Sequence, residues 1–518
     1  MSRVLLGQSY FLQFDPKLWR AMQPYPPLGS LYAAALLREA GHDVRFFDAM
    51  LAPSTAEWAR LLREAKPAVA LLFEDNFNYL SKMCLLRMRD AAFEMIDAAK
   101  AQGCVTVVCG PDVTDHARDY LARGADFAVV GEGDATILEL IGAVDEGRDD
   151  FESIAGLIYR GAHGEIVSTG ARPALRELDA LPPPARDLLD IESYRAAWQR
   201  HGRFSMNLVT SRGCPFHCNW CAKPIWGQRY NSRSPAAVVA EIESLRAVGA
   251  DHLWFVDDIL GIKPGWLAEF ADLIEAAGLR TPFKCLSRAD LLLRPGEIDA
   301  LRRAGCETVW IGAESGAQSV LDAMEKGTTV DQIRAAASGL RAAGIRCAFF
   351  LQFGYPGETW DEIEATRRLV RECDPDDIGM SVSYPLPGTP FYERVKDSMS
   401  GSANWVDSQE MPMLYEGAYP TPFYHRLHEA LHAEFRLRKA TRGAGVAPTT
   451  LRLLRRGAAR GALSLAKDAA LLPLYRARLE RERRRSQRNE TVLPVALSRA
   501  AAATPSSQDE EAGAAGRR

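Results

Sequence analysis

Three cysteines lie close together in one short segment of this 518-residue chain. Cys214, Cys218 and Cys221 belong to the run Ser211-Arg212-Gly213-Cys214-Pro215-Phe216-His217-Cys218-Asn219-Trp220-Cys221. Thiolates on one loop can converge on one metal centre, and soft sulfur ligands select zinc or an iron–sulfur cluster. Either His217 completes a four-ligand zinc site, for which this spacing is unusual, or a cluster keeps one iron open for another molecule. The spacing favours the cluster, and an open iron predicts catalysis.

The segment that positions these cysteines is the first part of a long β/α series. A strand at 205–210 leads into the cysteine run, and amphipathic helical segments separate the strands that follow it. Those strands are expected at 252–256, 283–287, 308–312, 347–353 and 378–384. Six such units predict a partial (β/α)6 barrel of the TIM type, with its chemistry at the carboxyl ends of the strands.

The spacing Cys-x3-Cys-x2-Cys after the first barrel strand, with Trp220 before the third cysteine, resembles the radical S-adenosylmethionine superfamily. The resemblance implies that Cys214, Cys218 and Cys221 hold a [4Fe-4S] cluster. It also implies that the open iron chelates S-adenosylmethionine, which the reduced cluster cleaves to a 5′-deoxyadenosyl radical. An electron donor such as flavodoxin or ferredoxin is implied as well.

Residues at the later strand ends extend the resemblance. Trp220 and Asp257 are implied near the cofactor, Asp257 on the side of its amino group. Ser287 and Arg288 could reach the carboxylate or ribose of S-adenosylmethionine. Glu314 resembles the family's ribose-binding acid, and Gly354, in Phe353-Gly354-Tyr355-Pro356-Gly357-Glu358-Thr359, resembles its adenine-side loop. The alternative for each is local, because carboxylates at strand ends often cap helices and glycines often form turns.

Residues 1–145 read as an alternation of strands and helices, which predicts a parallel sheet covered by helices. Several features resemble the cobalamin-binding domain that is fused to many radical S-adenosylmethionine enzymes. They are Pro26-Pro27-Leu28-Gly29-Ser30-Leu31 before a helix, Cys109-Gly110-Pro111-Asp112-Val113-Thr114, and Val130-Gly131-Glu132-Gly133-Asp134. The resemblance implies cobalamin contacts at Gly110, Thr114, Gly131 and Gly133. A generic nucleotide-type sheet, or a degenerate domain without cobalamin, is the alternative.

One motif of the mutase-type cobalamin proteins is missing. Their Asp-x-His-x-x-Gly, whose histidine coordinates cobalt, does not occur here, so His42 and His116 are not expected to be cobalt ligands. Glu74, Asp75 and Asn76, after the third expected strand, could face the cobalt instead.

The chain as a whole is expected to be an α/β protein with five parts. A Rossmann-like cobalamin-binding domain at 1–145 precedes a linker with a hairpin at 146–203 and the radical S-adenosylmethionine barrel at 204–395. A helical, basic region at 396–490 and a disordered tail at 491–518 follow, and residues 451–490 carry 12 Lys/Arg against 4 Asp/Glu. That basic region is either a solvated helix face or a peripheral contact with an anionic membrane.

The composition restricts the function further. The chain is 47% hydrophobic and 25% charged with a formal net charge of −4, which argues against nucleic acid as a partner. Its N-terminus becomes polar by Gln8, too early for a signal peptide, and no run has the length of a membrane span. We therefore expect a cytoplasmic protein with reduced thiols. Seven further cysteines are scattered and fit small buried side chains: Cys84, Cys104, Cys109, Cys285, Cys306, Cys347 and Cys373.

Together these features predict radical methylation of an unactivated carbon, on a small-molecule or lipid substrate, by S-adenosylmethionine and methylcobalamin. Oxidative cyclisation or rearrangement on the same machinery is the first alternative. A non-catalytic cobalamin-binding sensor is an alternative of another class, which the intact cysteine run disfavours. Transfer of a methylthio group to transfer RNA is also disfavoured, because Cys84, Cys104 and Cys109 form no second cluster motif.

Overall fold

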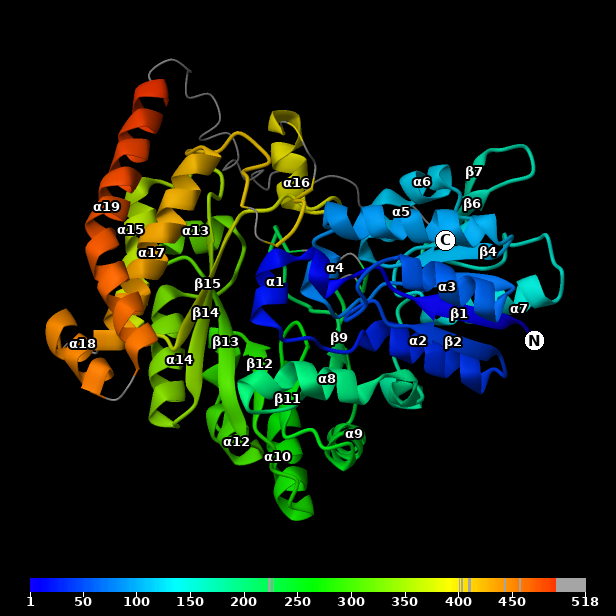
Figure 1. Ribbon diagram of the computed structural model, residues 1–518, viewed down its shortest axis with the longest axis horizontal. Helices are drawn as coiled ribbons and strands as arrows, with labels where there is room; N and C mark the ends of the chain where they lie inside the picture. The colour runs from blue at the N-terminus through cyan, green and yellow to red at the C-terminus, as the bar shows by residue number, and fades with distance from the viewer. Residues whose placement is uncertain are drawn as a thin grey trace, which may run out of the picture.

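Figure 1 shows the computed structural model of the protein. The structure describes residues 1–221, 225–226, 228–399, 401, 404–408, 411–441, 444–455 and 458–490. The predicted disordered tail at 491–518 lies outside the described residues.

The N-terminal domain is built on a seven-stranded sheet with the order β2-β1-β3-β4-β5-β6-β7. Its first five strands are parallel and run β1 (Arg3–Gly7), β2 (Asp43–Phe47), β3 (Val69–Phe73), β4 (Val105–Cys109) and β5 (Phe127–Val129). Alternate residues of these strands pack against different helix layers, because successive side chains point to opposite faces. Val4 and Leu6 join the core formed with α2 (Leu28–Glu39) and α7 (Asp134–Asp145). Leu5 joins the core on the other face, formed with α3 (Ala56–Ala65), α5 (Leu86–Ala101) and α6 (Pro111–Arg123).

The predicted hairpin forms, but it belongs to this sheet. Strands β6 (Leu157–Arg160) and β7 (Ile166–Ser168) pair antiparallel, and β6 pairs antiparallel with β5. The sheet therefore continues past residue 145. Helix α6 begins at Pro111, because a proline at the first helical position lacks only an N–H that would have no partner within the helix.

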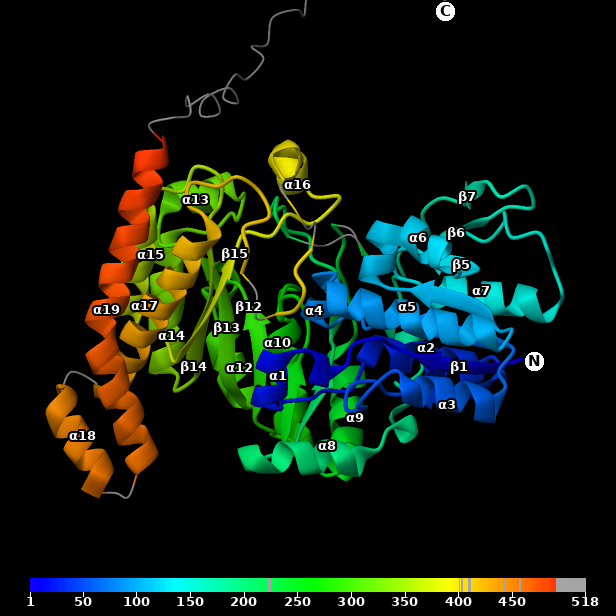
Figure 2. The same cartoon turned by 45° about the horizontal axis from the view of Figure 1, so that its top comes forward.

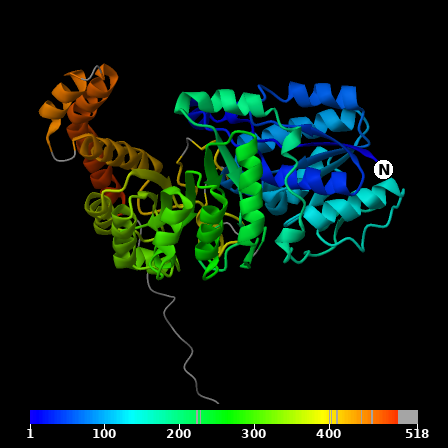
Figure 3. The same ribbon diagram turned by 90° about the horizontal axis from the view of Figure 1, so that it is seen from below.

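The second sheet is the predicted six-stranded barrel, with the order β15-β14-β13-β12-β11-β8. All of its strands are parallel: β8 (Ser205–Leu208), β11 (His252–Phe255), β12 (Phe283–Ser287), β13 (Cys306–Glu314), β14 (Arg346–Phe353) and β15 (Asp377–Val382). The long connecting helices are α9 (Pro235–Ala247), α10 (Trp266–Ala277), α12 (Glu297–Ala304), α14 (Val330–Ala342) and α15 (Trp360–Cys373). Figure 3 shows these helices along the outer side of the barrel. The α/β fold class predicted from the sequence is confirmed.

Short elements complete the two domains. The short helices are α1 (Pro16–Ala21), α4 (Tyr79–Lys82), α8 (Ile191–Trp198), α11 (Ala289–Leu292), α13 (Gln318–Ala323) and α16 (Pro390–Val395). A small antiparallel pair is formed by β9 (Ser211–Arg212) and β10 (Asn231–Ser232). Single 3-10 turns occupy Leu12–Phe14, Leu178–Ala180, Arg186–Leu188, Gln199–His201 and Lys396–Ser398.

The C-terminal region is helical, as predicted. It comprises α17 (Thr421–Thr441), α18 (Val446–Arg455) and α19 (Ala459–Glu490), so the helical stretch expected over 448–486 is divided into two helices. Figure 2 shows α19 alongside α17 at the end of the molecule opposite the N-terminal domain. Within the described residues, no helix is both long and apolar enough to cross a membrane.

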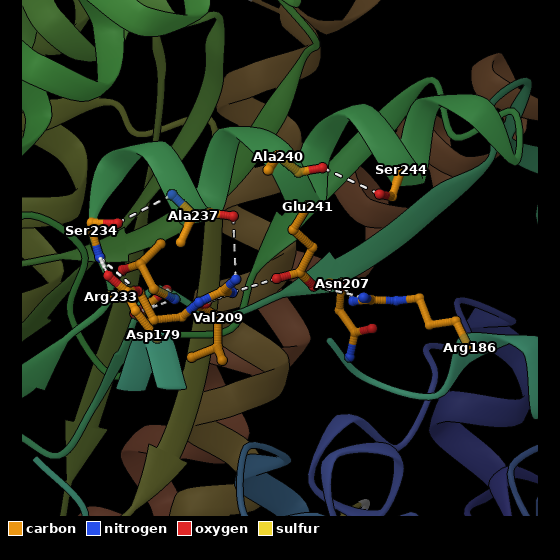
Figure 4. A network of polar contacts seen from close by, with 12 residues as sticks. Asp179, Arg186, Asn207, Val209, Arg233, Ser234, Ala237, Ala240, Glu241 and Ser244 are labelled. Carbon is orange, nitrogen blue, oxygen red and sulfur yellow. Dashed lines mark hydrogen bonds and ion pairs between the residues drawn. The ribbon is translucent and has the colours of Figure 1, made fainter. Parts of the chain in front are cut away.

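The connector between the domains is fastened to the first barrel strand by a buried acid (Figure 4). Glu241 on α9 accepts a hydrogen bond from Arg186 of the connector at 2.6 Å and pairs also with Arg233. Arg186 in turn donates to the backbone oxygen of Asn207 on β8 at 2.6 Å, and Arg233 donates to that of Val209 at 2.9 Å. The connector and the strand that leads to the cysteines therefore form one rigid unit.

Candidate active site

The strand end before the cysteines is held by Asp257, which follows β11. Its carboxylate accepts hydrogen bonds from the Thr210 backbone at 3.1 Å, from the Thr210 hydroxyl at 2.7 Å and from the Ser211 hydroxyl at 2.5 Å. Burial raises the pKa of Asp257 to about 6, although these hydrogen bonds lower it. Asp257 thus positions the strand end before the cysteine loop, and its place near the amino group of the cofactor stays a prediction.

The cysteine loop itself is anchored through Asn219. Cys214 is buried, while Cys218 and Cys221 are half-buried. Asn219 is 1% exposed, and its backbone N–H donates to Met324 at 3.1 Å. Its side chain accepts a hydrogen bond from the Tyr355 hydroxyl at 3.0 Å. Sequence reasoning missed Asn219, for which a polar residue between two candidate ligands was the available signal.

Two basic side chains lie near Cys218, and each is paired with an acid, Arg288 with Asp290 and Lys326 with Glu314. Arg288 places Nη1 4.0 Å from the Cys218 sulfur and lies over the Phe216 ring at 3.6 Å. Lys326, which the sequence analysis also missed, pairs with Glu314 at 2.8 Å, and both side chains are buried. Cations beside a thiol stabilise its thiolate, the form that binds metal. The loop is therefore electrostatically suited to an anionic cluster.

The remaining residues proposed for S-adenosylmethionine lie around this loop. The Lys326 ammonium is 5.9 Å from the centroid of the Trp220 ring, and Trp220 Nε1 is buried without a hydrogen-bond partner among the described residues. Glu314 has a left-handed φ of 55°, which is costly for a residue other than glycine and clusters at functional sites. Ser287, at the end of β12, donates to the Leu260 carbonyl at 3.4 Å.

Gly354 occupies the turn after β14 with φ of 78°. Its N–H donates to Glu358 Oε2 at 2.6 Å, and its carbonyl accepts a hydrogen bond from Tyr415. Glu358 is 2% exposed, and burial raises its pKa to about 8. Glu358 Oε1 has no hydrogen-bond partner among the described residues, so this loop holds one more buried polar atom that a ligand could satisfy.

On the facing edge of the N-terminal sheet, the structure brings the four predicted cobalamin residues together. The Thr114 hydroxyl donates to the Gly110 carbonyl at 2.9 Å and accepts from the Gly131 N–H at 3.1 Å, so it ties two loops to each other. A Cβ at Gly110 would lie 2.5 Å from Cβ of Glu74, and one at Gly133 would overlap the Cys109 sulfur. These glycines are therefore required by close backbone approach.

The end of β3 adds buried oxygen acceptors to this edge. Asp75 Oδ1 accepts from the Gly29 N–H at 2.9 Å, whereas Asp75 Oδ2 and Asn76 Oδ1 have no partner among the described residues. Glu74 accepts a hydrogen bond from the Ser9 N–H at 2.9 Å, and burial raises the pKa of Glu74 to about 8. Unsatisfied acceptors at the carboxyl ends of β1 and β3, where the strand order reverses, fit a bound ligand that donates hydrogen bonds.

The two histidines that the sequence excluded as cobalt ligands are engaged in ion pairs. His42 lies 3.5 Å from Asp145, and His116 lies 3.0 Å from Asp112. Asp112 is in addition bound by Arg89 at 2.6 Å and by the Tyr120 hydroxyl at 2.7 Å.

The two halves of the site meet at Arg212, two residues before Cys214. Its guanidinium pairs with Asp134 at 2.8 Å and with Glu132, and all three side chains are at most 8% exposed. The aromatic faces of Tyr32 and Phe77 lie 5.6 and 5.7 Å from it. The cysteine loop of the barrel is thus bonded directly to the Gly131–Asp134 loop of the N-terminal sheet. Sequence reasoning did not assign Arg212.

A three-cysteine loop on a partial β/α barrel, bonded to the glycine loops of a doubly wound sheet, is the arrangement of an iron–sulfur enzyme with a second ligand-binding domain. The comparisons with known proteins agree. Residues 20–141 match the B12 binding domain, and residues 208–370 match the radical SAM superfamily. The chain belongs to the radical S-adenosylmethionine enzymes that carry a B12-binding domain, and its cofactors are a [4Fe-4S] cluster, S-adenosylmethionine and cobalamin.

Similar proteins include both methyltransferases and a cyclase. A methyltransferase of Pyrococcus horikoshii is 27% identical over 73% of this chain and 81% of its own length. The anaerobic magnesium-protoporphyrin IX monomethyl ester cyclase of Rubrivivax gelatinosus is 26% identical over 72% of this chain and 67% of its own. The hopanoid C-3 methylase of Methylococcus capsulatus is 28% identical over 70% of this chain and 67% of its own.

Two solved structures share the fold. The radical S-adenosylmethionine methyltransferase TsrM from Kitasatospora setae, with cobalamin and a [4Fe-4S] cluster bound, has a TM-score of 0.63 at 21% identity, covering 77% of this chain and 75% of its own. The cobalamin-dependent radical enzyme OxsB has a TM-score of 0.66 at 15% identity, covering 90% of this chain and 72% of its own.

We predict that Arg212→Met destabilises the protein by about 3–5 kcal/mol, because it leaves Glu132 and Asp134 as buried carboxylates without their cation. The shift of the urea unfolding midpoint measures this. Arg60→Met is the matched control, since the Arg60–Glu64 pair is exposed (54% and 56%) and should contribute about 0–1 kcal/mol. Equal shifts for both variants would contradict the importance of the buried pair.

The raised pKa of Glu358 predicts a pH-dependent stability. The folded protein holds this proton up to about pH 8, whereas the unfolded chain releases it near the ordinary value of 4.5, so the free energy of unfolding falls as pH rises between these values. Glu358→Gln removes this loss while keeping an oxygen for the Gly354 N–H. The thermal midpoint of the variant should exceed that of the wild type increasingly from about pH 6 to about pH 8. A constant difference across this range would show that Glu358 does not titrate there.

Proposed function

We propose that the protein methylates an unactivated carbon of a small-molecule or lipid substrate. The observation that carries this proposal is the Arg212 contact, which sets the cysteine loop against the cobalamin-domain loop at Glu132 and Asp134. When bound, the cofactors supply a 5′-deoxyadenosyl radical for hydrogen abstraction and a cobalt-borne methyl group. The two reagents can act on one carbon only if both face the same space, and this contact supports such an arrangement.

In this proposal Cys214, Cys218 and Cys221 hold the [4Fe-4S] cluster, and flavodoxin or ferredoxin supplies its electron. Arg288 and Lys326 add positive charge beside the cluster, and Asp257 fixes the loop through Thr210 and Ser211. The other residues proposed to contact S-adenosylmethionine surround the same loop: Trp220, Ser287, Glu314 and Gly354. Closely placed positive charge favours the thiolate forms and a carboxylate ligand.

For cobalamin, the proposal assigns the contact surface to four residues: Gly110, Thr114, Gly131 and Gly133. The open acceptors of Asp75 and Asn76 would receive hydrogen bonds from it. Because His42 and His116 lie beside carboxylates, the proposal uses neither histidine as a cobalt ligand.

Oxidative cyclisation is a second candidate, and the cyclase relatives favour it. They are named for action on magnesium-protoporphyrin IX monomethyl ester, whereas other relatives are named as methyltransferases, including the hopanoid C-3 methylase. Cyclisation would use the same radical and leave no methyl group on the product.

We predict that the reconstituted enzyme transfers label from methyl-labelled S-adenosylmethionine to its product and forms 5′-deoxyadenosine in parallel. Cys218→Ser should lower both rates by at least about 100-fold, because an altered ligand disables the open-iron site. Cys373→Ser, a buried thiol of α15 outside the site, should retain both activities. Deoxyadenosine without label in the product would instead establish cyclisation or rearrangement. Retained cleavage in Cys218→Ser would refute the cluster assignment.

The finer proposal for the C-terminal region is a peripheral membrane contact. Leu451, Leu454 and Leu463, on α18 and the start of α19, are 50%, 52% and 71% exposed. Arg452, Arg455 and other basic residues adjoin them, and the sequence has no acidic residue between Glu434 and Asp468. Exposed apolar side chains among arginines suit the interface of an anionic bilayer.

We predict that the full-length protein co-sediments with vesicles that contain phosphatidylserine, and less with neutral phosphatidylcholine vesicles. Replacement of Leu451, Leu454 and Leu463 by serine should reduce the bound fraction about tenfold, since each removes apolar area from the interface. Val248→Ser, at a residue 39% exposed on another helix end, is the control. Undiminished binding by the triple variant would assign the contact to another surface, and absence of binding by wild type would end the proposal.

A further inference from the structure

The inner face of the barrel sheet carries an aromatic pair that the hydrophobic core does not use. Trp310 on β13 and Phe350 on β14 are stacked, with ring centroids 4.5 Å apart, and Phe350 is 39% exposed. Their strand neighbours Ile311 and Phe349 point the other way and are fully buried in the core with the outer helices. Because side chains alternate along a strand, Trp310 and Phe350 face the lumen.

Small residues flank Phe350 on both neighbouring strands, whereas Trp310 has Ala348 on one side and Leu286 on the other. Phe350 lies in register with Gly312 on one side and with Gly379 on the other, and Trp310 lies in register with Ala348. A Cβ at Gly379 would come within 3.2 Å of the Phe350 ring. Because the two rings face each other, a further planar ring can stack only on an outer face of the pair, which we call the floor.

A basic side chain, Lys284, lies beside this floor. Lys284 on β12 is half-buried and lies over the Trp254 ring at 3.6 Å, and the described residues offer it no salt-bridge partner. Its register partner is Thr308, the inward-facing residue that precedes Trp310 on the same face. Glu307, at the same end of the barrel, already pairs with Arg203 and Arg346 at 2.9 Å each. Burial lowers the pKa of Lys284 to about 8, as expected for a cation that lacks a counter-ion.

The floor lies below the cysteine loop. Trp310 and Glu314 lie opposite Ala348 and Leu351 of β14, with a register shift between Gly312 and Glu314, so the strand between them spans about 10 Å. Glu314 pairs with Lys326, whose ammonium lies 5.9 Å from the centroid of Trp220 in the cysteine loop. A ligand that rests on the floor could thus present its other end to the proposed cofactors.

We propose that the barrel lumen binds a planar aromatic ring that bears a carboxylate, with the ring stacked on Trp310 and Phe350 and the carboxylate paired with Lys284. This inference rests on the proposed function, since it names the substrate class of the same enzyme. A stacking surface selects planar rings, and an unpartnered, half-buried ammonium selects an anion.

The test uses the full-length reconstituted protein and three probes: 1-pyrenebutyrate, which has ring and carboxylate; 1-pyrenebutanol, which has the ring alone; and palmitate, which has the carboxylate alone. Fluorescence titration should show pyrenebutyrate binding about tenfold more tightly than pyrenebutanol, and palmitate competing weakly. Phe350→Ala should weaken both pyrene probes about tenfold. Lys284→Met should abolish the preference for pyrenebutyrate, whereas Lys284→Arg, which keeps the positive charge, should retain it.

Further variants guard against misfolding. Gly379→Val places a side chain against the Phe350 ring, which lies 3.2 Å from the Cβ position, so it should displace that ring and weaken both pyrene probes. Trp19→Ala and Lys263→Met, at exposed positions outside the lumen, should change nothing. Equal affinities in wild type, Phe350→Ala and Gly379→Val, or a preference that survives Lys284→Met, would overturn the inference, as would palmitate binding as tightly as pyrenebutyrate.

The test also separates this inference from the proposed function. Cys218→Ser should lose 5′-deoxyadenosine formation and keep pyrenebutyrate binding, whereas the control Trp19→Ala should keep both. A wild type that cleaves S-adenosylmethionine but shows no lumen binding would refute the inference alone. Lumen binding without cleavage would refute the proposed chemistry alone.

Discussion

A buried ion pair between two domains governs the arrangement of this enzyme. Arg212 from the barrel and Glu132 and Asp134 from the N-terminal sheet are all removed from water. Each of these charges would be costly alone, and their mutual attraction offsets the cost only when the geometry is good. Any shift of one domain against the other would separate the charges in a medium of low polarity. The pair therefore restricts the domains to one relative position.

The surrounding contacts are less selective. Tyr32 and Phe77 from the N-terminal domain pack with Ile225 and Trp226, which follow the cysteine loop, and Phe77 stacks on Trp226 with ring centroids 5.4 Å apart. Such apolar contacts supply much of the burial but tolerate small displacements. The hydrogen-bonded charges add direction to that burial. The apolar contacts thus supply burial, and the charged contacts fix the relative position of the domains. Arg212 has the second role, which explains why an arginine lies two residues before the first cysteine of the loop.

The sequence predicted most of the strands and helices, and few of the contacts that join the two domains. Strand β12 was predicted with its observed bounds, because a run of mostly apolar residues between turn residues is a local signal. The cysteine loop was found from its spacing alone. Asn219, Lys326 and the Arg212 pair were missed, because their partners lie far away in sequence: 104 residues separate Asn219 from Ala323, and 80 separate Arg212 from Glu132. No periodic pattern in the sequence indicates pairs between residues so far apart in the chain.

The inner face of the barrel shows a second reason why sequence patterns do not predict the whole site. In a parallel sheet covered on both faces, large apolar residues occur at both positions of the alternation, so Trp310 and Ile311 look equivalent in the sequence. Exposure separates them: Ile311 is fully buried, whereas Phe350, the stacking partner of Trp310, is 39% exposed. The small neighbours Gly312, Ala348 and Gly379 complete the distinction, because they let the Trp310 and Phe350 rings lie close to the sheet. The inner face is therefore shaped as a binding surface, and it lies beneath the loop that the Arg212 pair holds in place.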